Sequence, residues 1–124
     1  MTDDWEFICT LANDCKKAMI AAGLECQTQG YMVSGIVDVW VIRQDKRIGI
    51  VRIQFDKIST QVIKDPSEWE GTGDIGWAVP RYCGFDISDP SWDPTQTITT
   101  VVANMLEQIG EAGYEIDMPN NMGH

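Results

Sequence analysis

Three runs of β-type sequence, joined by short polar links, constrain the fold of this chain more than any other feature. Residues 31–43, 48–55 and 58–63 are rich in β-branched side chains, which favour strands. The link at 44–47 has the length of a hairpin connection, and the link at 56–57 is shorter. Parallel neighbours need a crossover of about a dozen residues, so the three runs predict an antiparallel meander.

Alternation within each run assigns its side chains to two faces of the sheet. The first run is apolar on both faces, so we expect a central strand that is covered on each side for part of its length. Its two faces consist of Val33, Val37, Val39 and Val41, and of Met32, Ile36, Trp40 and Ile42. The later runs each place one apolar set on a single face, namely Val51, Ile53 and Phe55, and then Ile58, Thr60 and Val62.

A helix is predicted on each side of the meander. Residues 3–22 repeat apolar side chains at helical spacing, at Trp5, Ile8, Ala12, Cys15, Met19 and Ala22, and Gly23 ends the pattern. A second helix is expected at about 94–110, with Asp93 as N-cap and Pro94 in its first turn. Its predicted buried stripe is Ile98, Val101, Val102, Met105 and Ile109.

Residues 65–93 interrupt this regularity with prolines, glycines and three tryptophans. Within them, alternation at 74–79 predicts a short fourth strand that Pro80 ends, and the remainder is expected to be an ordered loop. We therefore predict one α+β domain over 1–124, with helices packed on an antiparallel sheet of three to four strands and a loose tail at 117–124. The expected core includes Ile8, Cys15, Val39, Val51, Ile53, Val102 and Met105.

Charge is distributed unevenly along the chain. The net charge is −10, and residues 1–64 hold eight acidic and eight basic side chains. Residues 65–124 hold eleven acids and a single base, Arg81, so the whole excess lies there. Nucleic-acid binders neutralise phosphates with lysine and arginine, so direct nucleic-acid binding is not expected. A protein with a basic surface is the favoured partner, while solubility alone is the simpler explanation of the acidity.

Several kinds of chemistry lack their residues. The only histidine is His124, which disfavours histidine-dependent catalysis. The four cysteines are unclustered, so we expect free thiols, no metal and no cofactor. Asp38 begins a nuclease-like pattern, but the next strand offers Arg52 and Gln54 where an acid and a lysine are needed. The acidic start and the lack of a long apolar run favour a cytoplasmic protein that does not bind membranes.

One stretch resembles a known enzyme family. Cys83-Gly84-Phe85-Asp86-Ile87, then Trp92-Asp93-Pro94 and Thr97-Ile98, is similar to the region after the active-site cysteine of ubiquitin-conjugating (E2) enzymes. The resemblance implies a thioester-forming role for Cys83 and a fold of helix, meander and helix. The family's His-Pro-Asn turn is absent here, and the spacing from Cys83 to Trp92 is one residue longer.

The favoured function is that of a small protein-binding inhibitor or adaptor without enzymatic activity. Tryptophan is enriched in binding hot spots, and the acids around it would steer a basic partner. The predicted partner-binding residues are Asp65, Glu68, Trp69, Glu70, Asp74, Asp86, Asp89 and Trp92. Phage-encoded anti-CRISPR or anti-restriction blockers, immunity proteins and secretion chaperones are comparable in size and acidity. The alternative docking surface is the basic turn at Lys46 and Arg47, and the sequence does not indicate an oligomeric state.

Overall fold

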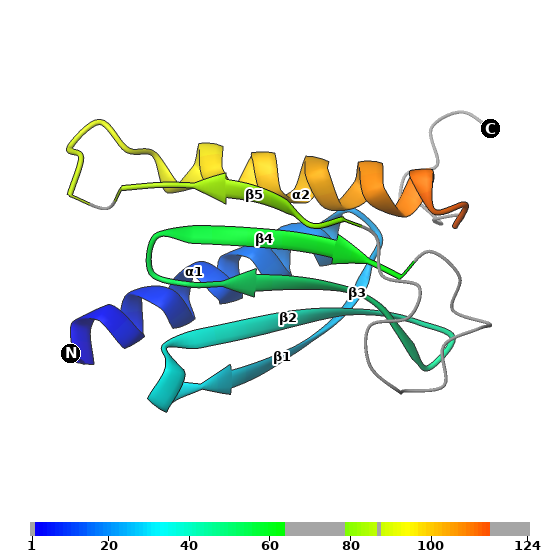
Figure 1. The fold of residues 1–124 in the computed structure, drawn as a ribbon, viewed down its shortest axis with the longest axis horizontal. Coiled ribbons are helices and arrows are strands. Elements are labelled where there is room, and N and C mark those ends of the chain that lie inside the picture. The colour runs from blue at the N-terminus through cyan, green and yellow to red at the C-terminus, as the bar shows by residue number, and fades with distance from the viewer. Residues whose placement is uncertain (1, 64–78, 87, 115–124) are drawn as a thin grey trace.

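The computed structural model describes residues 2–63, 79–86 and 88–114. Its elements run in the order helix, strands, helix, as α1 (Thr2–Ala21), β1 (Glu25–Tyr31), a short 3-10 helix η1 (Met32–Ser34), β2 (Ile36–Arg43), β3 (Lys46–Ile53), β4 (Lys57–Val62), β5 (Arg81–Gly84) and α2 (Pro94–Glu111). The strands form an antiparallel sheet in the order β1-β2-β3-β4-β5 (Figure 1). The α+β class and the meander are confirmed, with five strands in place of three to four.

The first predicted strand is divided in the structure. Residues 31–43 were expected to form one strand, but β2 begins only at Ile36, and η1 separates it from β1. Gly35 allows the break, because it takes a left-handed backbone conformation with φ of 67°. Sequence patterning missed β1 because only Cys26 among its seven residues is buried, which leaves no apolar alternation to detect.

The hairpin connections are tighter than predicted. Gln44 and Asp45 form a two-residue turn between β2 and β3, and both have positive φ, at 53° and 64°. Such turns match the right-handed twist of paired strands. Phe55 was expected in a strand, but β3 ends at Ile53 and Phe55 lies in the following turn with 40% of its surface exposed.

The last strand lies later in the chain than expected. The predicted strand at 74–79 falls outside the described residues, apart from Val79, which precedes β5. Instead of an ordered loop, residues 81–84 form β5, which pairs with β4 in the register Ile58 opposite Cys83. The predicted loose tail also lies outside the described residues.

Both helices cover the same face of the sheet (Figure 1). The core lies between the two helices and this face of the sheet. Its buried residues are Ile8, Leu11, Cys15 and Met19 of α1, Val37, Val39, Val41, Val51, Ile53, Ile58 and Val62 of the strands, and Val101, Met105 and Ile109 of α2. Helix α2 approaches the sheet closely at Gly49, where an added Cβ would lie 3.3 Å from the Met105 sulfur. We call this side of the sheet the helix-covered face and the opposite side the outer face.

Helix α2 starts as predicted but is rotated relative to the expected stripe. Asp93 caps it by accepting a hydrogen bond from the Thr95 amide. Val102 and Ile98 were expected to be buried, yet both are only half-buried, and Gln108 is buried instead. The Gln108 amide group donates to the carbonyls of Thr60 at 3.1 Å and Val79 at 3.3 Å, and its oxygen accepts from the Thr60 hydroxyl. These bonds satisfy a polar side chain that apolar spacing could not place in the interface.

The adjacent residues Val101 and Val102 provide a matched test of this orientation. Val101→Asp should unfold the protein, because Val101 has 0% exposure and a buried unpaired charge costs several kcal/mol, roughly. Val102→Asp should be tolerated at a cost of about 1–2 kcal/mol, because its side chain is only half-buried. Urea denaturation of both variants measures the difference. Equal losses of stability would show that the rotation of α2 is wrong.

Candidate functional site

The topology brings four segments to one end of the molecule. Val37 pairs with Ile53, so the β1–β2 connection and the β3–β4 turn are neighbours. Lys57 pairs with Gly84, which adds the loop between β5 and α2. The first turns of α1 lie at the same end (Figure 1). We call this region the acidic end, formed by Trp5–Phe7, η1, Phe55–Asp56 and the loop residues 85, 86 and 88–93.

An aromatic cluster forms the base of the acidic end. The rings of Phe85 and Trp92 stack with centroids 5.2 Å apart, and Phe7 of α1 tilts against Trp92 at 5.5 Å. The Trp92 indole N–H donates to the Thr97 hydroxyl at 2.8 Å, which ties the ring to the first turn of α2. Trp92 is half-buried, so it supports the loop while part of its surface stays accessible. Its predicted role in partner binding stays a prediction.

The loop carboxylates are exposed and locally hydrogen-bonded. One oxygen of Asp86 accepts from the Ser88 amide and hydroxyl, and one oxygen of Asp89 accepts in the same way from Ser91. The two bonds from Ser91, first the one from its amide and then the one from its hydroxyl, lower the pKa of Asp89. Asp89 therefore stays ionised at neutral pH, and the loop holds its negative charge in a defined position.

The one basic residue of the second half does not neutralise this loop. Arg81 donates to Glu107 at 2.6 Å and to Glu111 at 2.7 Å, so its charge is engaged along α2. The ion pairs raise the pKa of Arg81. At the acidic end, the described exposed acids are Glu6, Asp56, Asp86, Asp89 and Asp93, and the described base there is Lys57. The end is therefore strongly negative.

Exposed apolar side chains lie beside these acids. Val33 is fully exposed, and Met32 retains 67% of its surface, although both were predicted to lie in a strand. They line a hollow of about 450 Å³ together with Trp5 and Phe55. A second hollow of about 350 Å³ lies along the loop, between its acids and Cys83. Alternation alone could not identify this apolar group, because it does not show where a strand stops.

The predicted site residues are only partly placed. Asp86, Asp89 and Trp92 lie together on the loop between β5 and α2. The others, Asp65, Glu68, Trp69, Glu70 and Asp74, fall outside the described residues. The structure also shows which segment lies next to the loop that carries these three residues. The Phe85 amide donates a hydrogen bond to the Asp56 carbonyl at 3.0 Å. This bond joins the loop to the β3–β4 turn and its apolar side chains.

Cys83 lies in a setting that disfavours a thiolate. It belongs to β5 on the helix-covered face and is half-buried, and this burial raises its pKa. The neighbouring Cys15 is fully buried, which together with Asp14 and Cys83 raises its pKa to about 12. All four cysteines are free thiols. An attacking cysteine needs a lowered pKa, so this environment does not favour the thioester chemistry that the E2 resemblance implies.

Asp38 is held in a structural ion pair. Its side chain is 1% exposed on the outer face, and Arg52, directly across on β3, binds both of its oxygens at 2.9 and 3.0 Å. The bond to Asp38 raises the pKa of Arg52. In the described part of the chain, no group of three metal-binding side chains is present. Arg52 therefore engages both oxygens of the carboxylate that a nuclease centre would need as a metal ligand.

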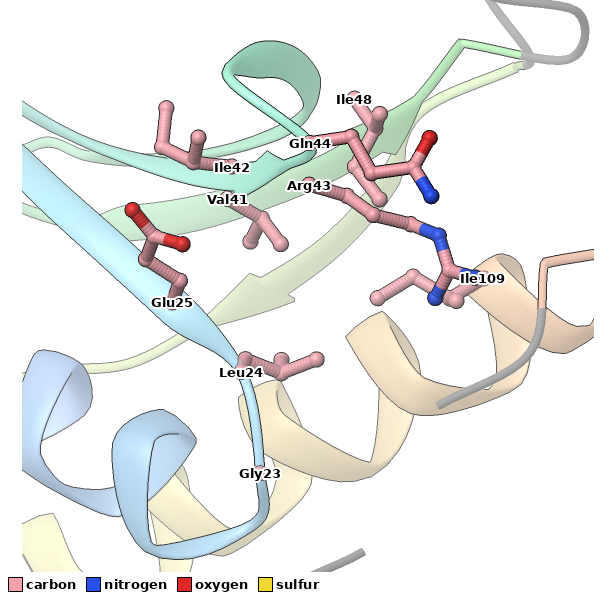
Figure 2. A pocket seen from close by; sticks show the side chains of 9 residues that line it. All are labelled: Gly23, Leu24, Glu25, Val41, Ile42, Arg43, Gln44, Ile48 and Ile109. Carbon is pink, nitrogen blue, oxygen red and sulfur yellow. The ribbon is translucent and has the colours of Figure 1, made fainter. Parts of the chain in front are cut away.

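At the opposite end, a small hollow lies between the β2–β3 hairpin, the start of β1 and the end of α2. Figure 2 shows Arg43 extending toward Ile109, with Glu25 and Leu24 on the β1 side. Its volume is about 180 Å³, smaller than the ~300–1,000 Å³ that sites for drug-sized ligands occupy.

Neither described helix is long and apolar enough to span a membrane. No protein-family model, curated protein or solved structure matches this chain.

Alkylation kinetics test the state of Cys83. Because burial raises its pKa, its reaction with iodoacetamide should accelerate only as pH rises above the ordinary thiol range, and it should be slow at neutral pH. Mass spectrometry of peptides after timed alkylation gives the rate at each pH. Rapid alkylation of Cys83 at pH 7 would instead indicate an activated nucleophile and revive the thioester hypothesis.

Single and double variants test the ion pair. Arg52→Met should destabilise the fold by about 3 kcal/mol, because the buried Asp38 carboxylate loses its partner. Asp38→Leu combined with Arg52→Met should recover most of that loss, since no buried charge remains. Urea unfolding followed by tryptophan fluorescence provides the comparison. A double variant as unstable as the single one would indicate that the pair has a role beyond mutual neutralisation.

Proposed function

We propose that this protein binds another protein through the acidic end and acts as an inhibitor or adaptor, without catalysis of its own. The observation that supports this most directly is the combination of uncompensated carboxylates with exposed apolar side chains. If the acidic side chains served only to keep the protein soluble, no exposed apolar side chains would be needed beside them. A binding surface benefits from both, because apolar anchors contribute affinity and charges contribute steering and specificity.

The chemistry of the partner follows from the sign of the charge. Aspartates at Asp86, Asp89 and Asp93 would face lysines and arginines of a partner, and phosphate would be repelled. A surface rich in carboxylates can occupy a groove that normally holds a nucleic-acid backbone. We therefore favour a target that handles nucleic acid, as for the anti-CRISPR, anti-restriction and nuclease-immunity classes. This comparison is one of class and not of sequence.

The apolar residues at this end suit a different task from the acids. Met32, Val33 and Phe55 expose their side chains around a hollow, where a partner side chain could be desolvated. Long-range steering would bring the partner to the loop, and burial at this hollow would then slow its dissociation. On this model, charge changes alter the association rate, whereas apolar truncations alter the dissociation rate.

Isosteric variants separate charge from structure. Asp86→Asn and Asp89→Asn retain the oxygen that accepts the serine hydrogen bonds and remove only the charge. Asp45→Asn, in the β2–β3 turn at the other end, is the matched control. A partner captured from the native host and identified by mass spectrometry should bind the double variant about two- to tenfold more slowly, and the control at the wild-type rate. Duplex DNA should compete with the wild-type protein for that partner.

Two results would contradict this proposal. Unchanged association of the Asp86→Asn, Asp89→Asn double variant would exclude the loop charges as the steering surface. Loss of binding on substitution of Lys46 and Arg47 would place the partner on the basic turn instead. Raising salt to physiological strength provides an independent check, because exposed charges are screened beyond ~8–10 Å and association should slow.

A further inference from the structure

In the part of the chain that the structure describes, the outer edge of β1 faces no other strand. β1 is the first strand of the sheet, and among the described residues it pairs only with β2. Six of its seven residues are exposed. Edge strands are commonly protected by lysine, proline or a bulge, and β1 has no such residue and an unbroken register with β2. Its edge is therefore a template for another extended strand.

A shallow groove runs along this edge beneath one flank of α1. Cys9, Ala12 and Asn13 of the helix and Thr28 and Gly30 of the strand line a hollow of about 170 Å³. The small side chains create the space, and the Trp5 ring packs against Gly30, where an added Cβ would lie 3.3 Å away. An added strand would thus have backbone partners on β1 and room for small side chains below α1.

The same flank of α1 exposes an isoleucine. Lys16 continues the groove-lining face of α1, because it follows Cys9 and Asn13 at helical spacings of four and three residues. Ile20 follows one helical turn later on the same flank and retains 48% exposure. Trp5 and Ile20 are therefore the large apolar side chains at the two ends of this flank, with Asn13 and Lys16 between them.

Charge identifies a second copy of the chain as a suitable occupant. Two chains of net charge −10 repel each other wherever their acidic regions approach. The most acidic segment, the loop between β5 and α2, is distant from the β1 edge, because β5 lies four strand spacings away, about 19 Å. Residues 1–64, which build α1 and β1 to β4, hold equal numbers of acids and bases. Because η1 and Glu6 of the acidic end lie near the Tyr31 end of β1, antiparallel copies place their acidic ends on opposite sides of the joined strands.

We propose that two copies of the chain pair antiparallel through their β1 strands, around a twofold axis at Thr28, and form one continuous sheet. Thr28 is the middle residue of β1, so this register uses the whole strand. It places Glu25 opposite Tyr31, Cys26 opposite Gly30, Gln27 opposite Gln29, and Thr28 opposite its own copy. No like charges meet, and the symmetry brings Ile20 of each copy toward Trp5 of the other. Twofold dimers are the commonest protein assemblies.

A charge-swap experiment tests this pairing in the full chain. Wild-type protein in the micromolar range should have twice the 13.9 kDa mass of one chain by light scattering. Thr28→Lys and Thr28→Asp should each raise the dimer dissociation constant about tenfold, because a threonine pair becomes two like charges directly opposite each other. An equimolar mixture of the two variants should restore dimers, since lysine then faces aspartate. Thr28 is exposed, so neither variant should disturb the monomer fold.

Two further variants make the test specific. Thr10→Lys, at an exposed position of α1 that does not line the groove, is the matched control and should leave the dimer unchanged. Ile20→Asp should weaken dimerisation without lowering the unfolding midpoint of the monomer, because Ile20 is already half-exposed. A structural role for Ile20 would instead lower that midpoint.

Several outcomes would overturn the proposal. A wild-type protein that stays monomeric at all concentrations would do so, as would a dimer that is insensitive to Thr28→Lys. Monomeric variants that fail to combine when mixed would exclude the twofold register. If β1 amides became protected from hydrogen exchange only on addition of a partner protein, the edge would belong to a foreign strand. These results concern the β1 edge, whereas the proposed function is tested by Asp86→Asn and Asp89→Asn on the loop between β5 and α2, so the two proposals can fail independently.

Discussion

The packing of both helices on one face of the sheet is the constraint on which the rest of the structure depends. It buries one face of β2, β3 and β4, which carries Val39, Val51 and Ile58, against α1 and α2. Gln108 fixes α2 in place, because its amide bonds to β4 and to the Val79 carbonyl just before β5. A buried amide is costly without partners, so these bonds define a single orientation of α2. The loop that precedes α2 is positioned as a result.

The two edges of the sheet differ because of this arrangement. The β5 edge is bordered by α2, whose Glu107 and Glu111 engage Arg81 and leave the loop acids without its charge. The β1 edge lies beside a flank of α1 that carries small and apolar side chains. On the two proposals made above, the loop between β5 and α2 would contact a basic partner, and the β1 edge would pair with another strand. The Asp38–Arg52 pair between them contributes little net charge.

The sequence by itself determined the fold class and the elements with strong periodicity. Helix α1, strands β2 to β4 and the N-cap of α2 follow from the spacing of apolar residues and from the Asp-Pro step at Asp93 and Pro94. It also determined the charge asymmetry, which is a matter of counting. Periodicity succeeds here because it reports which face of one element is apolar, and burial of that face is the main driving force for folding.

The tertiary structure decided which elements are neighbours and which surfaces remain open. β1 has a polar sequence and became visible only through its pairing with β2, and β5 through its pairing with β4. Three apolar residues expected in strands, Met32, Val33 and Phe55, lie in exposed connections at the acidic end. Apolar spacing also assigned Val102 to the buried stripe of α2, whereas the structure buries Gln108 and leaves Val102 half-exposed. Local patterns cannot settle these points, because they depend on contacts between residues that are far apart in the chain.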